Sequence, residues 1–347
     1  MGLFDKFKKK HKLSSEESVK KVPQEEETIE QTDNHNLDEE ENVKEFVDTA
    51  PKPQQSEQSQ ASDEEDFDNG YKPYAFALLK DRIFNLLEFR DKLYEDWKIE
   101  PQIFVRNNDN FLAFTFMLAG MTFSCSHMPT PIPNREAEIV SKYNYIWKDA
   151  AQATQEHQSF VMIALVKNPC VDKIKTCTLF SKICGVIMAM KNASAVYMRE
   201  QKMIISPTEY RRQMEVIKEM EVKNKKYFPL SLWIYIGMAK GKEGGRGYTY
   251  GLQQLGKQEI EIVDQPFMPQ KMFQLMNAFA YFIIVENIDL EDGNRLNLDK
   301  EHQVIVEKSE GVMIKGESCK LIFPKDLLEQ MSEKTNEKEN LSVTENV

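Results

Sequence analysis

Two glutamates that alternate along a predicted strand have the clearest chemical potential in this sequence. Glu259 and Glu261 lie two residues apart, so their side chains leave the same face of the strand about 7 Å apart. Carboxylates in this arrangement could ligate a hard cation or divide the roles of general acid and base, with Lys257 as a positive neighbour on the same face. The alternative is a solvent-facing polar surface, opposite a buried face formed by Ile260 and Ile262.

Two glycines precede these glutamates. Gly251 and Gly256 admit a positive φ or a close backbone approach, so with Lys257 they could cradle an anion. The order does not match a phosphate-binding loop, because Gln258 follows the lysine where Ser or Thr is required. A bulge or a tight hairpin turn is the competing interpretation. The candidate binding residues are therefore Thr249, Gly251, Gly256, Lys257, Glu259 and Glu261.

Thiols and an imidazole are the other reactive groups. Cys125 and His127 would share a strand face and could act as nucleophile and base, but no third residue that orients the imidazole can be named. Cys170, Cys177 and Cys184 are seven residues apart, and this spacing separates them by about 10 Å along a helix axis. We therefore predict that these three are core residues. The sequence assigns no catalytic residue, no cofactor and no metal site.

The elements that position these residues alternate between helix and strand periodicity. Residues 74–190 read as β-α-β-β-α-β followed by a helix, with elements over 74–79, 81–97, 102–105, 111–126, 134–157, 160–166 and 171–190. Residues 195–325 repeat the β-α-β-β-α-β order, with elements over 195–205, 206–222, 231–238, 248–263 and 269–286. A terminal hairpin over 303–307 and 312–323 completes this second pattern. We predict an α+β fold of two successive ferredoxin-like layers, in tandem or fused, with halves at 74–190 and 195–325.

Charge separates this folded part from its flanks. The chain of 347 residues has a net charge of −11, and residues 1–73 carry 10 Lys and Arg against 20 Asp and Glu. Residues 14–70 contain almost no aromatic side chains, so we predict a disordered acidic leader over residues 1–70. We predict a second disordered tail over residues 329–347. The rest of the chain is nearly neutral, which argues against a nucleic-acid-binding face.

Membrane and redox signals are weak. No apolar run approaches the roughly 18–20 residues that span a bilayer, so no transmembrane segment is predicted. Residues 1–12 place Leu3, Phe4 and Phe7 among lysines, which predicts either weak contact with an anionic membrane surface or a frayed, solubilising terminus. The five cysteines are odd in number and scattered, which favours a reducing cytoplasm.

Several short segments carry a resemblance to a known family. They are Ala195–Tyr197, Ile204–Tyr210, Pro229–Ile234, Thr249–Leu252, Gly256–Glu261 and Asp292–Gly293. Together they resemble the bacterial family catalogued as domain of unknown function 4261 (DUF4261), over roughly residues 74–325 and most specifically over 195–293. The resemblance implies a cytoplasmic bacterial α+β protein with no established catalytic activity, and it supplies no catalytic residues.

The functional prediction is a non-catalytic binding or interaction protein that presents the 248–261 hairpin, with a protein partner and with the acidic leader as a tether. The alternative is a metal-assisted or acid–base enzyme, hydrolase-like, that uses Glu259 and Glu261. Neither a ligand nor an oligomeric state follows from the sequence.

Overall fold

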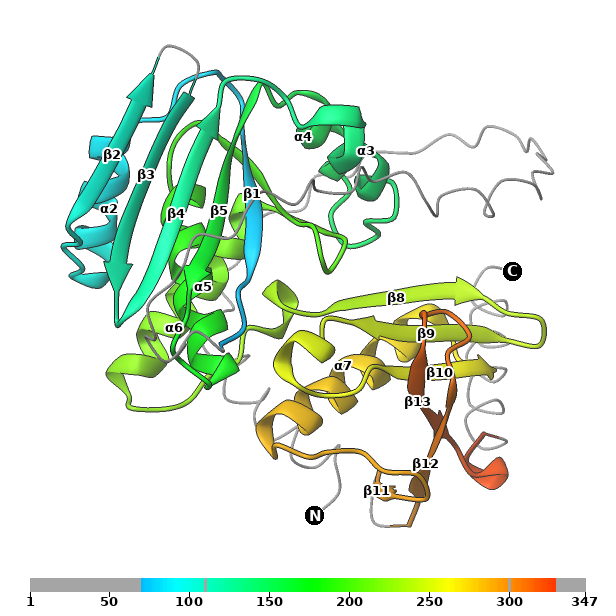
Figure 1. The fold of residues 1–347 in the computed structure, drawn as a ribbon. Helices are drawn as coiled ribbons and strands as arrows, with labels where there is room; N and C mark the ends of the chain where they lie inside the picture. The colour runs from blue at the N-terminus through cyan, green and yellow to red at the C-terminus, as the bar shows by residue number, and fades with distance from the viewer. Residues whose placement is uncertain (1–69, 109–110, 299–300, 329–347) are drawn as a thin grey trace, which may run out of the picture. The chain divides into compact units, whose positions relative to one another are not determined.

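The computed structural model describes residues 70–108, 111–298 and 301–328, which form an α+β fold with two sheets (Figure 1). Both sheets belong to one compact unit of the chain. The predicted leader (except for Gly70), the predicted membrane contact at residues 1–12 and the tail at 329–347 lie outside the described residues. Within the described residues, no helix is both long enough and apolar enough to cross a membrane.

The first sheet is antiparallel, with seven described strands in the order β2-β3-β4-β5-β1-β6-β7. Its strands are β1 (Tyr74–Leu79), β2 (Ile103–Asn108), β3 (Phe111–Leu118), β4 (Met121–Met128), β5 (Ser159–Lys167), β6 (Ala193–Met198) and β7 (Met203–Ile205).

The second sheet has six described strands in the order β11-β12-β13-β10-β9-β8. They are β8 (Tyr235–Lys240), β9 (Gly245–Tyr250), β10 (Ile260–Gln265), β11 (Arg295–Asn297), β12 (Gln303–Glu310) and β13 (Glu317–Ile322). The central pair β10 and β13 is parallel, and the other described pairs are antiparallel.

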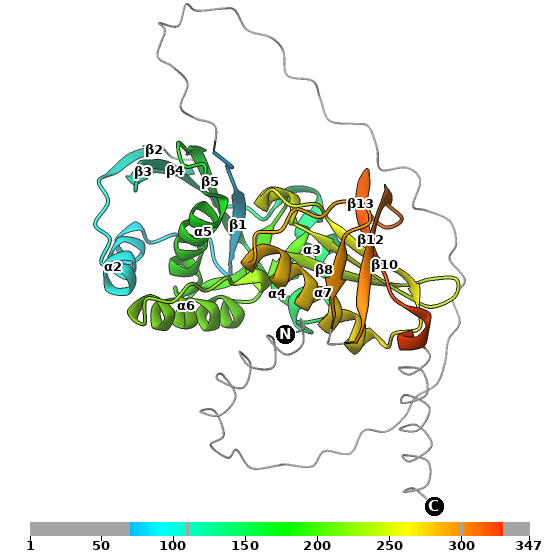
Figure 2. The same cartoon turned by 90° about the horizontal axis from the view of Figure 1, so that it is seen from below.

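The described helices are α2 (Leu86–Trp97), α3 (Glu136–Ser141), α4 (Ala150–Gln155), α5 (Lys173–Met188), α6 (Pro207–Val222) and α7 (Pro269–Val285). Short 3₁₀ turns lie at η1 (Pro133–Arg135), η2 (Leu230–Leu232) and η3 (Gln253–Leu255). Helices α5 and α6 lie side by side against the first sheet (Figure 2).

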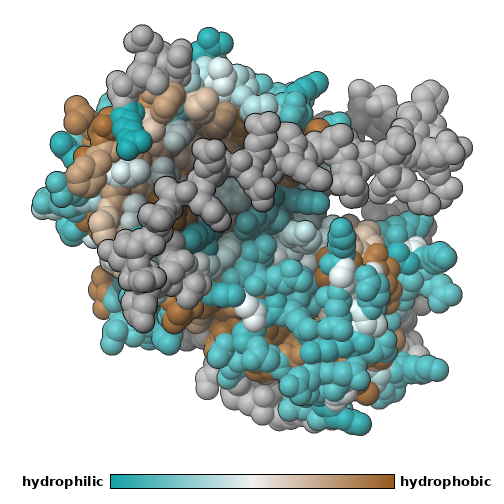
Figure 3. Space-filling view, in the orientation of Figure 1, coloured by the Kyte–Doolittle hydropathy of each residue, from teal (hydrophilic) through white to brown (hydrophobic). Residues whose placement is uncertain are grey.

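Alternation of side chains gives the first sheet two different faces. On one face, residues such as Ala77 and Val161 pack in the main core with α2 and α5. On the other, Leu78 and Phe160 form a smaller cluster under α3 and α4. Helices α3 and α4 cover this face only in part, and apolar residues are visible over β2–β4 (Figure 3). Phe104 and Met117 are 56% and 60% exposed there.

The ferredoxin-like layering is not confirmed, because the first sheet is larger than the repeat requires. The predicted strand 111–126 is the hairpin β3–β4, turned at Ala119 and Gly120, where φ is 51° and 80°. The predicted strand 195–205 is the hairpin β6–β7, and Ala77 of β1 pairs with Val196 of β6. The predicted boundary at 190–195 therefore does not coincide with a change of sheet, which comes after Ile205.

Helix boundaries follow local capping chemistry. Helix α6 begins as predicted, because the Ser206 hydroxyl accepts from the Glu209 amide at 3.0 Å and Pro207 occupies the first turn. The single helix predicted over 134–157 is wrong: it divides into α3 and α4. The Asn144 side chain accepts from the Ile146 and Trp147 amides between them, and this turn replaces helical bonding.

Helix α7 begins at Pro269 as predicted and covers one face of the second sheet. Met272 and Met276 are 1% and 0% exposed, so the methionine-rich stripe is core. Gly247 lets the helix approach β9, since a Cβ on this residue would lie 2.8 Å from the Met272 sulfur. The helix therefore fixes the strand that leads into the candidate binding residues.

Candidate functional site

The candidate binding residues lie along a wide hairpin formed by β9, η3 and β10: Thr249 and Glu261 lie in the strands, and the others lie in the connection between them. Thr249 is fully buried, and its hydroxyl accepts from the Ile260 amide at 2.9 Å across the hairpin. Gly251 has a φ of 129°, and a Cβ there would lie 2.3 Å from the Trp233 carbonyl oxygen. Gly256 ends η3 in the left-handed conformation, with a φ of 80°. Both glycines therefore serve the turn.

Glu261 is a structural anchor. Its side chain is 0% exposed. One carboxyl oxygen accepts from the Met313 and Ile314 amides at 2.6 and 3.2 Å, and the other accepts from the Val312 amide at 3.0 Å and the Ser318 hydroxyl at 2.8 Å. Three successive amides around an anion form a backbone nest. Four donors fill the acceptor positions of this carboxylate, so it has none free for a metal or a substrate.

Glu259 differs from Glu261 in having one oxygen free. Its side chain is also buried, with 3% of the residue exposed. Oε1 accepts from the Gly251 and Gln253 amides at 2.8 and 3.1 Å, and so closes the turn. No described residue donates to Oε2, although this atom is also buried. The expectation of a solvent-facing acidic surface is therefore wrong: the alternate residues on both sides of this segment are buried.

Lys257 pairs with an aspartate and forms no ion pair with either glutamate. Its ammonium forms an ion pair with Asp289 at 2.7 Å, and its side chain is 8% exposed. The predicted role of Lys257 as a positive neighbour of the paired carboxylates is therefore wrong. The cause is the turn η3, which places residue 257 before the strand rather than in it, so that strand alternation does not extend back to it.

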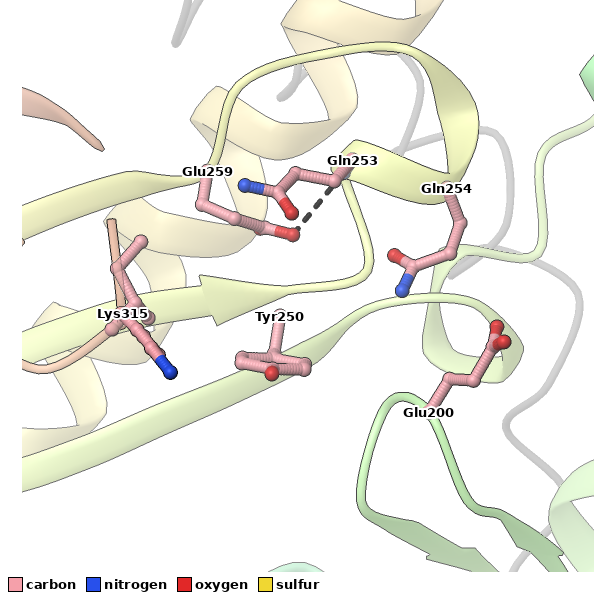
Figure 4. Close-up of a pocket in the computed structure, with 7 residues that line it drawn as sticks. Glu200, Tyr250, Gln253, Gln254, Glu259 and Lys315 are labelled. Atoms are coloured by element: carbon pink, nitrogen blue, oxygen red, sulfur yellow. Dashed lines mark hydrogen bonds between the residues drawn. The ribbon is translucent and has the colours of Figure 1, made fainter. Parts of the chain in front are cut away.

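A polar pocket of about 310 Å³ adjoins Glu259 (Figure 4). It is lined by Glu200, Tyr250, Gln253, Gln254, Glu259, Ile314 and Lys315. Glu200 comes from the β6–β7 turn and Lys315 from the β12–β13 loop, so the two sheets and the hairpin all contribute. The side chains of Glu259, Gln254 and Glu200 surround the same space in Figure 4.

Unpartnered acceptors distinguish this pocket. Besides Glu259 Oε2, the buried Gln254 Oε1 has no donor among the described residues. Glu200 accepts from the Tyr71 hydroxyl at 3.1 Å through one oxygen. Burial, followed by the negative groups nearby, raises the pKa of Tyr71, which keeps this hydroxyl a donor. Lys315 is exposed at the rim, and no hydrogen bond or ion pair joins it to a described residue.

A smaller cavity of about 10 Å³ continues beyond Gln254. Its lining includes Gln201 and Gly251, and Gln201 Oε1 is a further buried acceptor without a described donor. A space of this size matches a single water molecule. Gln254 lines both cavities, and each cavity has an unpartnered acceptor in its lining.

Cys125 and His127 do not form a reactive pair. Burial raises the pKa of the Cys125 thiol far above its ordinary value, and the side chain is 0% exposed. The His127 Nε2 atom instead lies 3.2 Å from the Ser159 hydroxyl, which itself donates to the Asp81 carbonyl at 2.6 Å. Burial lowers the pKa of His127. This cluster is therefore part of the core beside β5.

The predicted cysteine row is core for two of its three members. Cys177 and Cys184 lie on α5 and are 6% and 0% exposed, as predicted. Cys170 precedes the helix and is partly exposed. Within the described ranges, no group of three or more His, Cys, Asp or Glu side chains is arranged to hold a metal ion.

Sequence reasoning missed six of the seven residues that line the pocket: Glu200, Tyr250, Gln253, Gln254, Ile314 and Lys315. Tyr250 and Gln254 lie inside the predicted hairpin, and strand alternation gave no reason to select them. Glu200 and Lys315 lie far from it in sequence, in turns whose approach depends on how the two sheets pack. No local signal could have grouped them.

Comparison with curated proteins and with solved structures gives no match. One family does match, over residues 248–322, which begin in β9 and end with β13. The matched range is shorter than the 74–325 that the sequence resemblance implied. It contains all the candidate binding residues, together with Ile314 and Lys315 of the pocket. Residues 248–322 thus match the family described as Domain of unknown function (DUF4261).

Proposed function

We propose that this protein is a non-catalytic binding module, and that segment 248–261 forms its binding pocket together with the β6–β7 turn and the β12–β13 loop. The observation that carries the proposal is the state of Glu259, which is 3% exposed and has one carboxyl oxygen without a donor at the pocket. A buried acceptor without a partner costs about 1–3 kcal/mol. A ligand that supplies the missing donor would recover that free energy on binding.

The size of the pocket supports a small ligand. Small-molecule sites in proteins occupy about 300–1,000 Å³ and combine a few fixed polar groups with aromatic surface. The pocket, at about 310 Å³, is at the lower end of this range and contains the Tyr250 ring. A protein partner is the second form of the proposal, because Gln253 and Gly256 are exposed at the tip of the hairpin.

A cytoplasmic location is part of the proposal. All five cysteines are free, and four of them are buried. Free thiols suit a reducing compartment. The acidic leader would then act as a tether or partner-binding arm, which is a prediction from its composition alone.

The alternative is a metal-assisted or acid–base enzyme that uses Glu259 and Glu261. What supports binding over this alternative is the unequal state of the two carboxyl groups. Glu261 is held by four donors, whereas Glu259 has one oxygen free. A division of acid and base roles between them would require Glu261 to release part of the β12–β13 loop.

A ligand screen tests the proposed function. Thermal unfolding of the full chain would be recorded with a library of cationic, anionic and neutral polar metabolites, for the wild type, Gln254→Ala and Tyr250→Ala. Glu307→Gln on β12 is the control, because Glu307 is exposed and does not line the pocket. We expect at least one compound to raise the Tm of the wild type and the control by several degrees, but not that of the pocket variants.

Two outcomes would contradict the proposal. If no compound stabilises the wild type, or if every variant is stabilised equally, the pocket is not the binding site. If a bound compound is recovered chemically altered, as seen by NMR after incubation, the protein is an enzyme.

A further inference from the structure

We propose that the pocket binds the primary ammonium group of a small organic molecule, with Glu259 Oε2 and Gln254 Oε1 as acceptors. This inference rests on the proposed function and specifies the ligand class for the same site. Both atoms are buried and have no donor among the described residues, and both residues line the pocket. The ligand must therefore bring N–H or O–H donors rather than acceptors.

The charges of the lining favour a cationic donor. Among the residues that line the pocket, two carry a carboxyl group, Glu200 and Glu259, and one is basic, Lys315 at the rim. Hydrogen bonds between an ionised donor and a carboxylate are roughly twice as strong as neutral ones. The Tyr250 ring adds an aromatic surface that attracts cations, and Lys202 already lies 5.7 Å from its centroid.

The geometry of Glu259 favours an ammonium over a guanidinium. A guanidinium binds a carboxylate best through two parallel hydrogen bonds to both oxygens. Glu259 offers only Oε2, because the Gly251 and Gln253 amides occupy Oε1. An ammonium has three donors that point in different directions. Such a group can donate separately to Glu259 Oε2 and to Gln254 Oε1, the two unpartnered acceptors of the lining.

Lys315 restricts the rest of the ligand. It is exposed at the rim and has no ion pair with a described residue, so it would repel a second ammonium and attract an anionic group. The ligand is therefore a monoamine or an amino acid rather than a polyamine. The volume of about 310 Å³ suits a compound of this size.

Isothermal titration calorimetry on the full chain tests this inference with paired probes. Ethanolamine and glycine carry a primary ammonium, whereas choline and betaine, their respective counterparts, carry a trimethylated nitrogen without N–H donors. We expect a primary-ammonium probe to bind the wild type and its trimethylated counterpart to bind at least about 10-fold more weakly, since one charged hydrogen bond contributes about 1.5–3 kcal/mol.

Two variants connect the binding to the named atoms. Glu259→Gln can keep its oxygen on the Gly251 and Gln253 amides and so direct an NH₂ donor into the pocket, which should weaken amine binding about 10- to 100-fold. Gln254→Met removes the second acceptor at a partly exposed position, and serves if the first variant does not fold. Glu307→Gln should bind like the wild type.

Several results would overturn the inference. They are equal binding of choline and ethanolamine, no binding of any amine, or binding of Mg²⁺ or Ca²⁺ that is lost in Glu259→Gln without amine binding. In each case, hits of another chemical class in the thermal screen would leave the proposed function standing. If no compound stabilises the protein in the thermal screen either, both the proposed function and the ammonium site are contradicted.

Discussion

Replacing Glu261 by glutamine should destabilise the protein far more than the same change at an exposed glutamate. The substitution keeps the size of the side chain but replaces one acceptor oxygen by a donor. Glu261 holds the Val312, Met313 and Ile314 amides and the Ser318 hydroxyl, so its loss affects the whole β12–β13 loop.

The loss of stability can be worked out from these four hydrogen bonds. A hydrogen bond to a charged group contributes about 1 kcal/mol more than a neutral one, so the two bonds on the retained oxygen lose about 2 kcal/mol together. The Val312 amide loses its acceptor, at about 1–3 kcal/mol, whereas the Ser318 hydroxyl can rotate to accept from the new amide. We expect the free energy of unfolding to fall by about 3–5 kcal/mol, which corresponds to a fall in Tm of about 6–20 °C.

The assay is urea unfolding of the full chain, followed by circular dichroism, with thermal unfolding in parallel. Glu307→Gln on β12 is the matched control and should change the free energy of unfolding by less than about 0.5 kcal/mol, because Glu307 is exposed. If the two variants are equally stable, Glu261 does not anchor the loop, and the separation of roles between the two glutamates fails.

Three further predictions concern the core and the turn. Gly251→Ala should lower the free energy of unfolding by about 3 kcal/mol or more, because φ is 129° and a Cβ would lie 2.3 Å from the Trp233 carbonyl oxygen. Gly293→Ala, with a φ of 76° and no atom within 4 Å of the added Cβ, should lower it by only about 1 kcal/mol. Equal losses of the two variants in urea unfolding would contradict this prediction. Burial lowers the pKa of His127 below its ordinary 6.5, so the folded state disfavours the protonated ring. The stability of the protein should therefore fall as the pH decreases below about 6.5. If His127→Asn leaves the pH dependence of unfolding unchanged, His127 makes no such contribution. Iodoacetamide should label Cys170 first in the native protein, because the other four cysteines are buried and burial raises their thiol pKa values. If peptide mapping finds that Cys125 is labelled as fast as Cys170, the buried packing of β4 is contradicted.

Local signals in the sequence predict the helices with clear termini. Ser206 and Pro207 fix the start of α6, and Pro269 fixes the start of α7. The two hairpins β3–β4 and β6–β7 were predicted as single strands, because their turns lie in otherwise continuous strand-like runs. Sheet membership could not be predicted either, since the pairing of β6 with β1 depends on contacts between residues more than a hundred positions apart.

The candidate site shows the same division. The sequence identified Glu259 and Glu261 and the two glycines, because their types and spacing are unusual. Their burial could not be predicted, since strand alternation assumes one exposed face, whereas the β12–β13 loop and η3 cover this one. The role of each glutamate depends on which amides reach it, and those amides come from residues 251–253 and 312–314.

The most direct test of the account is a crystal structure of the full chain grown with saturating ethanolamine. We predict that Glu259 Oε1 remains on the Gly251 and Gln253 amides and that the ammonium nitrogen lies at hydrogen-bonding distance, about 2.7–3.2 Å, from Oε2 and from Gln254 Oε1. A structure in which Oε2 accepts from a donor of the protein itself, with no ammonium in the pocket, would contradict the central claim.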